Sequence, residues 1–503
     1  MTTERPTERP IDLDALTLGG VLDGVLRDRP VTVLGFARSG IALARFFADA
    51  GADVTVYDGR PASELASAIE ALEGRPVRLA LGPDVDPSVA WAAAALVATS
   101  PSINPDFPTT EPRLRAALRA LVADPGRATL VSEADLFVRL CPARTIGVTG
   151  TKGKTTTSSL IAAILAADPD HPAVLGGNIG MPLVERLPEL TPGDRVVIEL
   201  SELQLPTLSR GTTVAVYTNV TSDHLDRHGS LERYRAAKRR LAELVDPAGA
   251  LVLNADDPVV AAYAELGTAP VTLYGWGEPR ARGVGVVDGW IVADGAGRIM
   301  PIDELAVPGR HNVSNAMAGV AVGLWFGLAP GRIRAAAAAF TGVEHRLEPV
   351  ATVDGVRFVN DSQGTQPDAV IAALEAFEPP IVLIAGGRDK GVDLTDLAGV
   401  VARRAAAAVL LGESGPDLER LFRDAGLTET RRAGSLDEAV RAADAIARER
   451  LGTAPEGATA TVLLSPAAAS FDMFVDYAAR GRAFKEHVGR LAAERRDQRG
   501  RER

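Results

Sequence analysis

The stretch GVTGTKGKTTTSSLIAAIL, at residues 147–165, constrains this chain more than any other segment. An apolar run that enters a glycine-rich turn and continues with helical spacing predicts a strand, a tight loop and a helix. Such a loop directs backbone N–H groups and the positive end of the helix at a phosphate. The ordinary spacing, G-x-x-x-x-G-K-[ST], would place a glycine at Val148, which this chain lacks. The pattern therefore predicts a phosphate-binding loop of unusual spacing.

Lysine is scarce in this chain, and its positions support the same interpretation. Of 54 basic residues only five are lysines, namely Lys152, Lys154, Lys238, Lys390 and Lys485. Where arginine is the default cation, a lysine is more often needed as an amine. Two of the five lie in the predicted loop, where Lys154 can offset phosphate charge and the Thr155 hydroxyl can bind Mg²⁺. The alternative, a glycine-rich turn with two solvated lysines, explains their position less well.

Composition excludes several classes of function. The 503 residues carry a net charge of −11 and no basic stripe, so neither nucleic acid nor an anionic membrane is expected as a partner. The N-terminus is charged and contains prolines, unlike a signal peptide. The single cysteine, Cys141, excludes an intramolecular disulfide and a cysteine metal cage. We expect a cytoplasmic monomer without stable membrane insertion.

Three series of alternating strands and helices follow one another along the chain. They predict an α/β fold with an N-terminal Rossmann-like domain (1–132), a central P-loop-type ATPase domain (133–342) and a C-terminal Rossmann-like doubly wound sheet (343–503). The glycine- and valine-rich segment 271–309 predicts a small antiparallel addition. Residues 1–25 and 495–503 are expected to be flexible.

Acidic residues and a further lysine follow the predicted loop. Glu199 ends the apolar run VVIE, where a carboxylate needs a cation or a metal as partner. The loop NVTSDHLDRH places His224 among acidic residues, which favours a magnesium site, whereas His228 can be structural. Lys238 lies on a predicted helix, and its amine could react with CO₂ to form an anionic carbamate. The alternative for Lys238 is a solvated basic helix face.

These motifs, taken in order, resemble the Mur ligases of peptidoglycan synthesis. The shared motifs are TGTKGKTT, ELS, NVTSDHLDRH, PGRHNVSNAMA, HRLE and NDS. Within that family, GGNIG, RDKG and SPAAASFDMF resemble the branch that adds D-glutamate. The resemblance implies an ATP-dependent amide ligase that adds D-glutamate to UDP-N-acetylmuramoyl-L-alanine through an acyl phosphate and a tetrahedral intermediate. It also implies that closure of the third domain completes the site.

The resemblance implies roles for residues of the central and third domains. ATP would be bound by Gly150, Thr151, Lys152, Gly153, Lys154, Thr155, Thr156, Asn315, Arg346 and Asp361. The catalytic residues would be Lys154, Glu199, His224 and Lys238. Two Mg²⁺ ions would be held by Thr155, Glu199, His224 and Lys238, the last as N6-carboxylysine.

The same resemblance implies residues for the other two substrates. The UDP-linked substrate would contact Gly35, Gly40, Asp58, Arg60, Asn178, Ser201 and Gln204. Glutamate would contact Thr365, Lys390, Ser470 and Phe471, with Tyr477 close by. Gly59 and Ser102 depart from the family pattern near the uridine site.

Several alternatives remain open at this point. Gln363 stands where a lysine is common in the family, which leaves an L-glutamate-specific counterpart or another Mur-type ligase open. Folylpolyglutamate synthase begins near its phosphate loop, whereas about 145 residues precede the loop here. An NAD-dependent oxidoreductase would leave the phosphate loop without a purpose. A catalytically inactive nucleotide-binding regulator is disfavoured because every predicted phosphate and metal position is filled.

Overall fold

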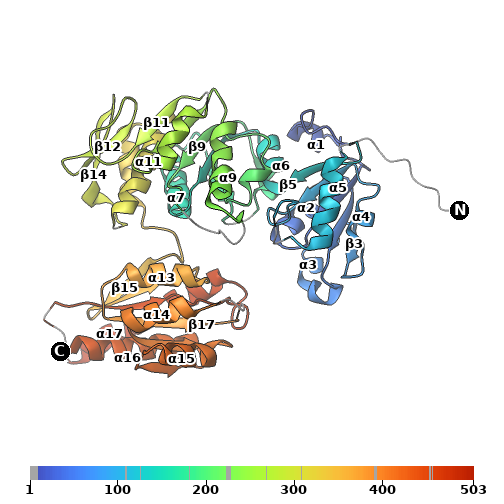
Figure 1. Ribbon diagram of the computed structural model, residues 1–503. Coiled ribbons are helices and arrows are strands. Elements are labelled where there is room, and N and C mark those ends of the chain that lie inside the picture. The colour runs from blue at the N-terminus through green and yellow to red at the C-terminus, as the bar shows by residue number, and fades with distance from the viewer. Residues whose placement is uncertain are drawn as a thin grey trace. The chain divides into compact units, whose positions relative to one another are not determined.

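The computed structural model describes residues 10–107, 110–124, 126–179, 182–221, 228–267, 269–307, 309–389, 393–452, 455 and 457–502. The chain forms two compact units, Met1–Phe340 and Thr341–Arg503. Their strands form three sheets of five, nine and six strands, each accompanied by helices (Figure 1). The three sheets confirm the predicted α/β fold class. The first unit holds the sheets predicted for the first two domains, and the predicted boundary between these two domains stays a prediction.

The five-stranded sheet of the first unit is entirely parallel, in the order β3-β2-β1-β4-β5. Its strands are β1 (Pro30–Leu34), β2 (Asp53–Asp58), β3 (Val77–Leu81), β4 (Leu96–Thr99) and β5 (Thr129–Ser132). Its helices are α1 (Leu18–Leu22), α2 (Arg38–Asp49), α3 (Ala66–Glu70), α4 (Pro87–Ala90) and α5 (Pro112–Ala123). The direction of strand succession reverses between β1 and β4, and α/β sheets bind ligands at such points, beyond the carboxyl ends of the strands.

The nine-stranded sheet of the first unit has the order β14-β13-β12-β11-β10-β9-β6-β8-β7. Its strands are β6 (Arg144–Thr149), β7 (Ala173–Gly177), β8 (Arg195–Glu199), β9 (Val214–Tyr217), β10 (Ala250–Asn254), β11 (Val271–Tyr274), β12 (Val284–Val287), β13 (Trp290–Ala293) and β14 (Gly297–Pro301). The principal helices are α6 (Glu133–Leu140), α7 (Lys154–Leu165), α9 (Leu231–Leu244), α11 (Arg310–Trp325) and α12 (Pro330–Ala339). The predicted antiparallel addition is right for β12–β14 and wrong for β11, which pairs in parallel with β10.

The six-stranded sheet of the second unit has the order β15-β16-β20-β17-β18-β19, with β15 as an antiparallel edge strand. Its strands are β15 (Glu348–Val353), β16 (Val356–Asn360), β17 (Ile381–Gly386), β18 (Ala405–Leu411), β19 (Thr430–Arg432) and β20 (Ala460–Leu464). Its helices are α13 (Pro367–Glu375), α14 (Thr395–Arg404), α15 (Gly415–Asp424), α16 (Leu436–Gly452) and α17 (Tyr477–Glu502). One hydrophobic core packs α16 and α17 on one sheet face, and a second core packs α13–α15 on the other.

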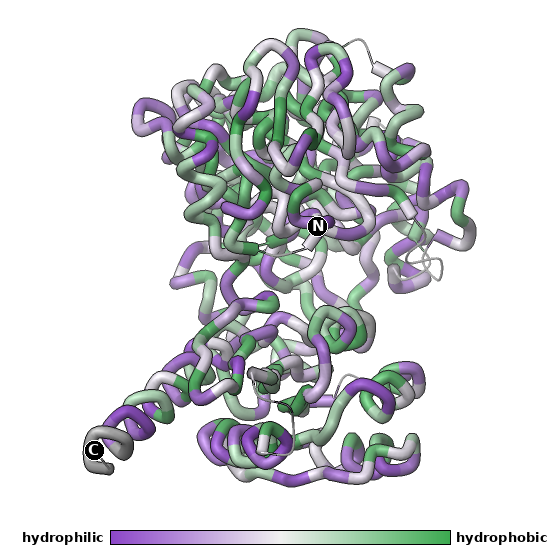
Figure 2. Tube along the Cα trace, turned by 90° about the vertical axis from the view of Figure 1, so that its left-hand side faces the viewer, coloured by the Kyte–Doolittle hydropathy of each residue, from purple (hydrophilic) through white to green (hydrophobic). Residues whose placement is uncertain are grey.

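The two terminal segments contain helices that the sequence does not predict. Helix α1 lies within 1–25, and α17 continues to Glu502. Hydrophilic and hydrophobic residues alternate along α17 toward the C-terminus (Figure 2). Phe484, Val488 and Leu491 are buried at helical spacing, so packing against the sheet stabilises this helix. Among the described helices, none is long and apolar enough to cross a membrane.

Gly40 allows α2 to pack closely against the turn that follows β1. A Cβ atom at Gly40 would lie 1.7 Å from the Gly35 carbonyl oxygen. Gly35 itself has φ 86°, in the left-handed region that favours glycine. Backbone geometry therefore requires glycine at positions 35 and 40, independently of any ligand.

We predict that Gly40→Ala destabilises the first unit by about 3 kcal/mol, the upper end of the usual cost of overpacking. Gly331→Ala is the matched control, because Gly331 also lies in the first turn of a helix but has open space around the Cβ position. The free energy of unfolding of this control should lie within about 1 kcal/mol of the parent value or be slightly higher. Calorimetric unfolding of both variants checks the prediction, and equal melting temperatures would contradict it.

Candidate active site

The loop between β6 and α7 is built around two glycines. Gly150 has φ 152°, and a Cβ atom there would lie 1.9 Å from Thr218 Oγ1. Gly153 has φ 82° and forms the N-cap of α7. The Thr151 N–H donates to the Asn219 carbonyl oxygen at 2.8 Å, and the Lys152 N–H donates to Asn219 Oδ1 at 2.9 Å. The segment after β9 therefore fixes the loop ahead of a helix N-terminus, which suits a phosphate.

Side chains of the loop differ in their environments. Lys154 is half-buried, and its Nζ donates to the carbonyl oxygens of Gly150 at 3.1 Å and Thr151 at 2.9 Å. Lys152 is exposed, Thr155 is buried and Thr156 is half-buried. Lys154 is thus folded over the loop, whereas Lys152 points into solvent.

Glu199 ends β8 beside the loop, because Glu199 pairs with Val148 in the parallel register. The side chain is 1% exposed, and its Oε1 accepts a hydrogen bond from Asn178 Nδ2 at 2.9 Å. Its Oε2 is buried and has no hydrogen-bond partner among the described residues. A buried carboxylate oxygen without a partner is costly unless a cation binds it. This oxygen and the Thr155 hydroxyl are the hard oxygen donors that Mg²⁺ prefers, so both residues fit a magnesium ion.

Other candidate metal ligands are limited by what the structure describes. His224 lies outside the described residues. Within the described ranges, no group of three or more histidine, cysteine, aspartate or glutamate side chains is arranged to hold a metal.

Lys238 reaches the same loop from α9. Its side chain is fully buried, and its Nζ donates to the Gly150 carbonyl oxygen at 2.9 Å and to Thr149 Oγ1 at 3.3 Å. The Nζ lies 5.6 Å from the centre of the Tyr234 ring. Lys154 and Lys238 therefore converge on one carbonyl oxygen, which brings two amines together that are 84 residues apart in the sequence (238 − 154).

Asn315 lies on α11 next to the loop. Its Oδ1 accepts a hydrogen bond from Thr157 Oγ1 at 3.0 Å, and a Cβ atom at Gly153 would approach this oxygen to 3.1 Å. The structure thus places Asn315 beside the start of α7.

Ser201 and Gln204 are hydrogen-bonded to each other just after Glu199. Both the Ser201 N–H and its Oγ donate to Gln204 Oε1, at 2.9 and 3.0 Å. Both residues are buried. The sequence identifies the two residues but gives no sign that they bind each other.

A cavity of 580 Å³ opens at the carboxyl ends of the first sheet, where the strand order reverses. The predicted residues Gly35, Asp58 and Arg60 line it, whereas Gly40 does not. The Asp58 carboxylate accepts hydrogen bonds from Arg60 Nη2 at 2.8 Å and from the Phe36 N–H at 2.8 Å. Burial raises the pKa of Asp58, but the hydrogen bonds from Arg60 and Phe36 outweigh it, so the net pKa is lowered.

The sequence does not identify several other residues of this cavity. They include Tyr57, Thr110, Glu111 and Arg113. Tyr57 is detectable in principle as the neighbour of Asp58, but the other three come from a distant segment that only the fold brings near. The departures from the family pattern, Gly59 and Ser102, also line the cavity.

Asp361 follows β16 in the second unit and is 4% exposed. Ser465 Oγ donates to its Oδ2 at 2.6 Å, and the Leu347 N–H donates to its Oδ1 at 3.2 Å. Burial raises the pKa of Asp361 to about 6, although both hydrogen bonds and nearby Arg346 act in the opposite direction. The structure thus joins the turn that carries Arg346 to the turn that carries Asp361.

The loops predicted to bind glutamate are neighbours within the second unit. The Ala467 N–H donates to the Gly364 carbonyl oxygen at 2.9 Å, which joins the segment before Thr365 to the segment before Ser470. Ser470 is buried, whereas Phe471 is 64% exposed. Lys390 lies outside the described residues. Gln363 Oε1 is buried without a hydrogen-bond partner among the described residues.

The Asp361 carboxyl predicts a pH dependence of stability. A carboxyl whose pKa rises on folding holds its proton more tightly in the native state, so stability present at low pH is lost as pH rises. The change falls between the ordinary pKa of 3.8 and the folded value of about 6. Relative to Asp361→Asn, the parent protein should lose about 3 kcal/mol across this window.

Hydrogen exchange of peptides covering β16 and β20 measures this effect, with parent and variant compared at the same pH so that intrinsic rates cancel. The exposed Asp417→Asn variant is the control and should show no such trend. A difference between parent and Asp361→Asn that is constant from pH 4 to pH 7 would contradict the prediction.

Comparison with known proteins assigns the chain to a family. Residues 148–323 match the Mur ligase middle domain, and residues 345–468 match the Mur ligase glutamate ligase domain. The UDP-N-acetylmuramoylalanine--D-glutamate ligase of Symbiobacterium thermophilum is 37% identical over 479 residues, covering 93% of this chain and all of the relative. The Geotalea uraniireducens protein of the same name is 39% identical over 470 residues, covering 93% of this chain and 98% of the relative.

Solved structures show the same fold. The UDP-N-acetylmuramate-alanine ligase MurC of Thermotoga maritima matches with a TM-score of 0.53 at 19% identity, over 92% of this chain and 99% of that one. MurF of Acinetobacter baumannii matches with a TM-score of 0.53 at 16% identity, over 96% of this chain and all of that one. The chain therefore belongs to the Mur ligase family.

Proposed function

We propose that this chain is an ATP-dependent amide ligase that joins D-glutamate to UDP-N-acetylmuramoyl-L-alanine and releases ADP and phosphate. The observation that carries the proposal is the convergence of Lys154, Lys238 and Glu199 on one glycine loop. A reaction between a carboxylate and a polyphosphate brings two anions together and needs such a concentration of charged groups. The names of the relatives identify which carboxylate and which amine are joined.

ATP would be held by the loop and by residues around it. The loop of residues 150–156 would surround its phosphates, with the N–H groups at the start of α7 directed at them. Lys154 would move from the loop carbonyls onto a phosphate oxygen, and Lys152 would add charge from the solvent side. Asn315 would contact adenine, and Arg346 and Asp361 would bind the phosphates and ribose. With its pKa near 6, Asp361 would be mostly ionised at neutral pH and could accept a hydrogen bond from a ribose hydroxyl.

Magnesium ions would be held by Thr155, Glu199, His224 and carboxylated Lys238. When bound, Mg²⁺ would neutralise the phosphates and lower the barrier for attack by a carboxylate. Asn178 would orient Glu199 by donating to its Oε1, which leaves Oε2 for the metal.

Carboxylation of Lys238 would resolve a conflict between the two lysines. Two ammonium groups that donate to one carbonyl oxygen repel each other at short range. The Lys238 ammonium first loses one proton. Addition of CO₂ to the neutral amine then forms a carbon–nitrogen bond and releases a second proton, so a cation becomes an anion. The carbamate would then attract both Lys154 and a metal ion.

The UDP-linked substrate would occupy the cavity of the first sheet. Gly35 and Gly40 shape the turn that would receive the diphosphate, and Asp58 and Arg60 would face the uracil. The muramoyl group would extend toward Asn178, Ser201 and Gln204. Because Ser201 and Gln204 bind each other, their positions are fixed before the substrate arrives.

The bond changes then follow from these placements. An oxygen of the alanyl carboxylate attacks the γ-phosphorus, and the bond to the ADP oxygen breaks. The glutamate amine, held by Thr365, Lys390, Ser470 and Phe471, attacks the acyl-phosphate carbonyl. The tetrahedral intermediate expels phosphate, and the amine loses a proton. We propose that this occurs in the cytoplasm, on a monomeric enzyme.

The direct test of the proposed function is phosphate release by the purified protein with ATP, Mg²⁺ and UDP-N-acetylmuramoyl-L-alanine. Parallel reactions contain D-glutamate, L-glutamate or no amino acid. We expect release with D-glutamate and a product one glutamyl residue heavier. Release with L-glutamate alone would assign the chain to an L-specific counterpart, and no release with either would overturn the proposal.

Lys238→Met tests the carbamate, because methionine keeps the side-chain length and removes the amine. We predict a fall in kcat of at least about 100-fold, comparable to the loss of an electrostatic catalytic group. In ¹³C-bicarbonate buffer, the parent protein should give a carbamate carbon resonance that this variant lacks. The exposed Lys152→Met is the control and should keep the resonance. A resonance that survives in Lys238→Met would contradict the assignment.

A further inference from the structure

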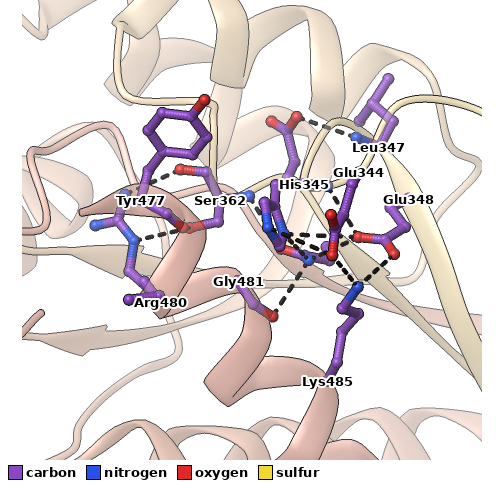
Figure 3. Close-up of polar contacts among 12 residues, drawn as sticks. Glu344, His345, Leu347, Glu348, Ser362, Tyr477, Arg480, Gly481 and Lys485 are labelled. Carbon is purple, nitrogen blue, oxygen red and sulfur yellow. Dashed lines mark hydrogen bonds and ion pairs between the residues drawn. The ribbon is translucent and has the colours of Figure 1, made fainter. Parts of the chain in front are cut away.

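Lys485 is the one lysine of five to which the proposed function gives no role. It lies on α17, and its Nζ donates to Glu344 Oε1 at 2.6 Å and to Glu348 Oε1 at 2.9 Å (Figure 3). In the sequence, Glu344 lies two residues before Arg346 and Glu348 lies two residues after it. One amine thus bridges both acidic neighbours of the arginine proposed to bind ATP.

The turn that carries Arg346 is strained. His345 has φ 65° and Leu347 has φ 45°, so two non-glycine residues on either side of Arg346 adopt the left-handed region. Such conformations persist only where surrounding contacts impose them, and they are common at functional sites. The direction of the Arg346 side chain therefore depends on the contacts that keep this turn in its conformation.

Glu348 and Asp361 hold the turn through its backbone. Glu348 Oε2 accepts hydrogen bonds from the His345 N–H at 2.9 Å and from Asn360 Nδ2 at 2.9 Å. Asp361 Oδ1 accepts from the Leu347 N–H at 3.2 Å. Each strained residue is thus tied by its N–H to a carboxylate, and Lys485 fixes one of these two carboxylates.

Helix α17 packs against the same turn at the His345 ring. A Cβ atom at Gly481 would lie 2.2 Å from His345 Nδ1, so the helix backbone approaches the imidazole closely. Asn360 Nδ2 lies 2.9 Å from His345 Nδ1 and donates to it, which places the proton of the neutral ring on Nε2. Figure 3 shows His345 beside α17 near Gly481, with Lys485 one turn further along that helix.

We propose that Lys485 is a positioning residue for Arg346. By binding Glu344 and Glu348 together, it holds the strained turn in place and prevents these carboxylates from competing with phosphate for the guanidinium group. This inference rests on the proposed role of Arg346 at the ATP phosphates.

Lys485→Met should raise the KM for ATP about fivefold, the effect of a partly exposed ion pair, and leave the KM for the UDP-linked substrate unchanged. Lys485→Arg keeps a cation that can bridge both carboxylates and should restore the KM for ATP to within about twofold of the parent. Calorimetric titration with ATP, without the other substrates, should show the same loss of affinity.

Arg441→Met is the matched control. Arg441 also bridges two carboxylates, donating to Asp437 at 2.9 Å and to Glu494 at 2.7 and 2.8 Å, between α16 and α17. It lies in the same unit but away from the Arg346 turn. The two methionine variants should therefore lose similar stability, and only Lys485→Met should lose affinity for ATP.

The His345 imidazole reports whether the charge of Lys485 reaches the turn that carries Arg346. Burial lowers the pKa of His345, Glu344 and Glu348 raise it, and Lys485 and Arg482 lower it. Asn360 and the Tyr477 ring, which also face the imidazole, are uncharged. Removal of Lys485 should therefore make the imidazole resonance titrate at higher pH, while Arg441→Met leaves it unchanged.

The outcomes separate the two proposals. If the parent protein neither binds ATP nor forms product, the proposed function fails. If the parent is active but Lys485→Met and Arg441→Met give equal KM values for ATP, the positioning role of Lys485 is wrong, whether or not the imidazole titration shifts. A selective loss of ATP affinity with a shifted titration supports it.

Discussion

The carbonyl oxygen of Gly150 is the point on which the candidate site depends. It accepts hydrogen bonds from both Lys154 and Lys238, which approach from α7 and α9. This arrangement requires a glycine, because a side chain at position 150 would collide with Thr218. It also requires β6 to lie between β8 and β9, since these neighbours bring Glu199 and the Thr218–Asn219 segment to the same loop.

The charges around this oxygen account for the chemistry. A site with two amines and one buried carboxylate attracts an anion and a metal ion at once. If Lys238 carries a carbamate, Lys154 is the cation that remains for the phosphates, and the carbamate and Glu199 are anions that can share metal ions. A carboxylate substrate and ATP can then approach each other without prohibitive repulsion.

The sequence predicts well those features that depend on short stretches of chain. The phosphate loop, the strands on either side of it and the position of Glu199 follow from local patterns and from the geometry of parallel sheets. The α/β fold class is confirmed, because alternating strands and helices are also local patterns. The prediction that β11 belongs to the antiparallel addition is wrong, because a short valine-rich run gives no indication of its pairing partner.

Features that depend on the exact path of the backbone or on long-range contacts could not be predicted. The hydrogen bonds that Ser201 donates to Gln204 span only three residues, but they need the exact path of the chain after β8. The bridge from Lys485 to Glu344 and Glu348 joins residues about 140 positions apart. Composition marks Lys485 as unusual, but only the packing of α17 against the Arg346 turn gives it a partner.

The central claim is that the chain activates a carboxylate by transferring phosphate to it from ATP. UDP-N-acetylmuramoyl-L-alanine labelled with ¹⁸O in the alanyl carboxylate tests this most directly, with ATP, Mg²⁺ and D-glutamate present. The account predicts that each phosphate released carries one oxygen atom from the substrate carboxylate, detectable by mass spectrometry. Product formation with unlabelled phosphate would contradict the account, because the carboxylate oxygen would then never have been bonded to phosphorus.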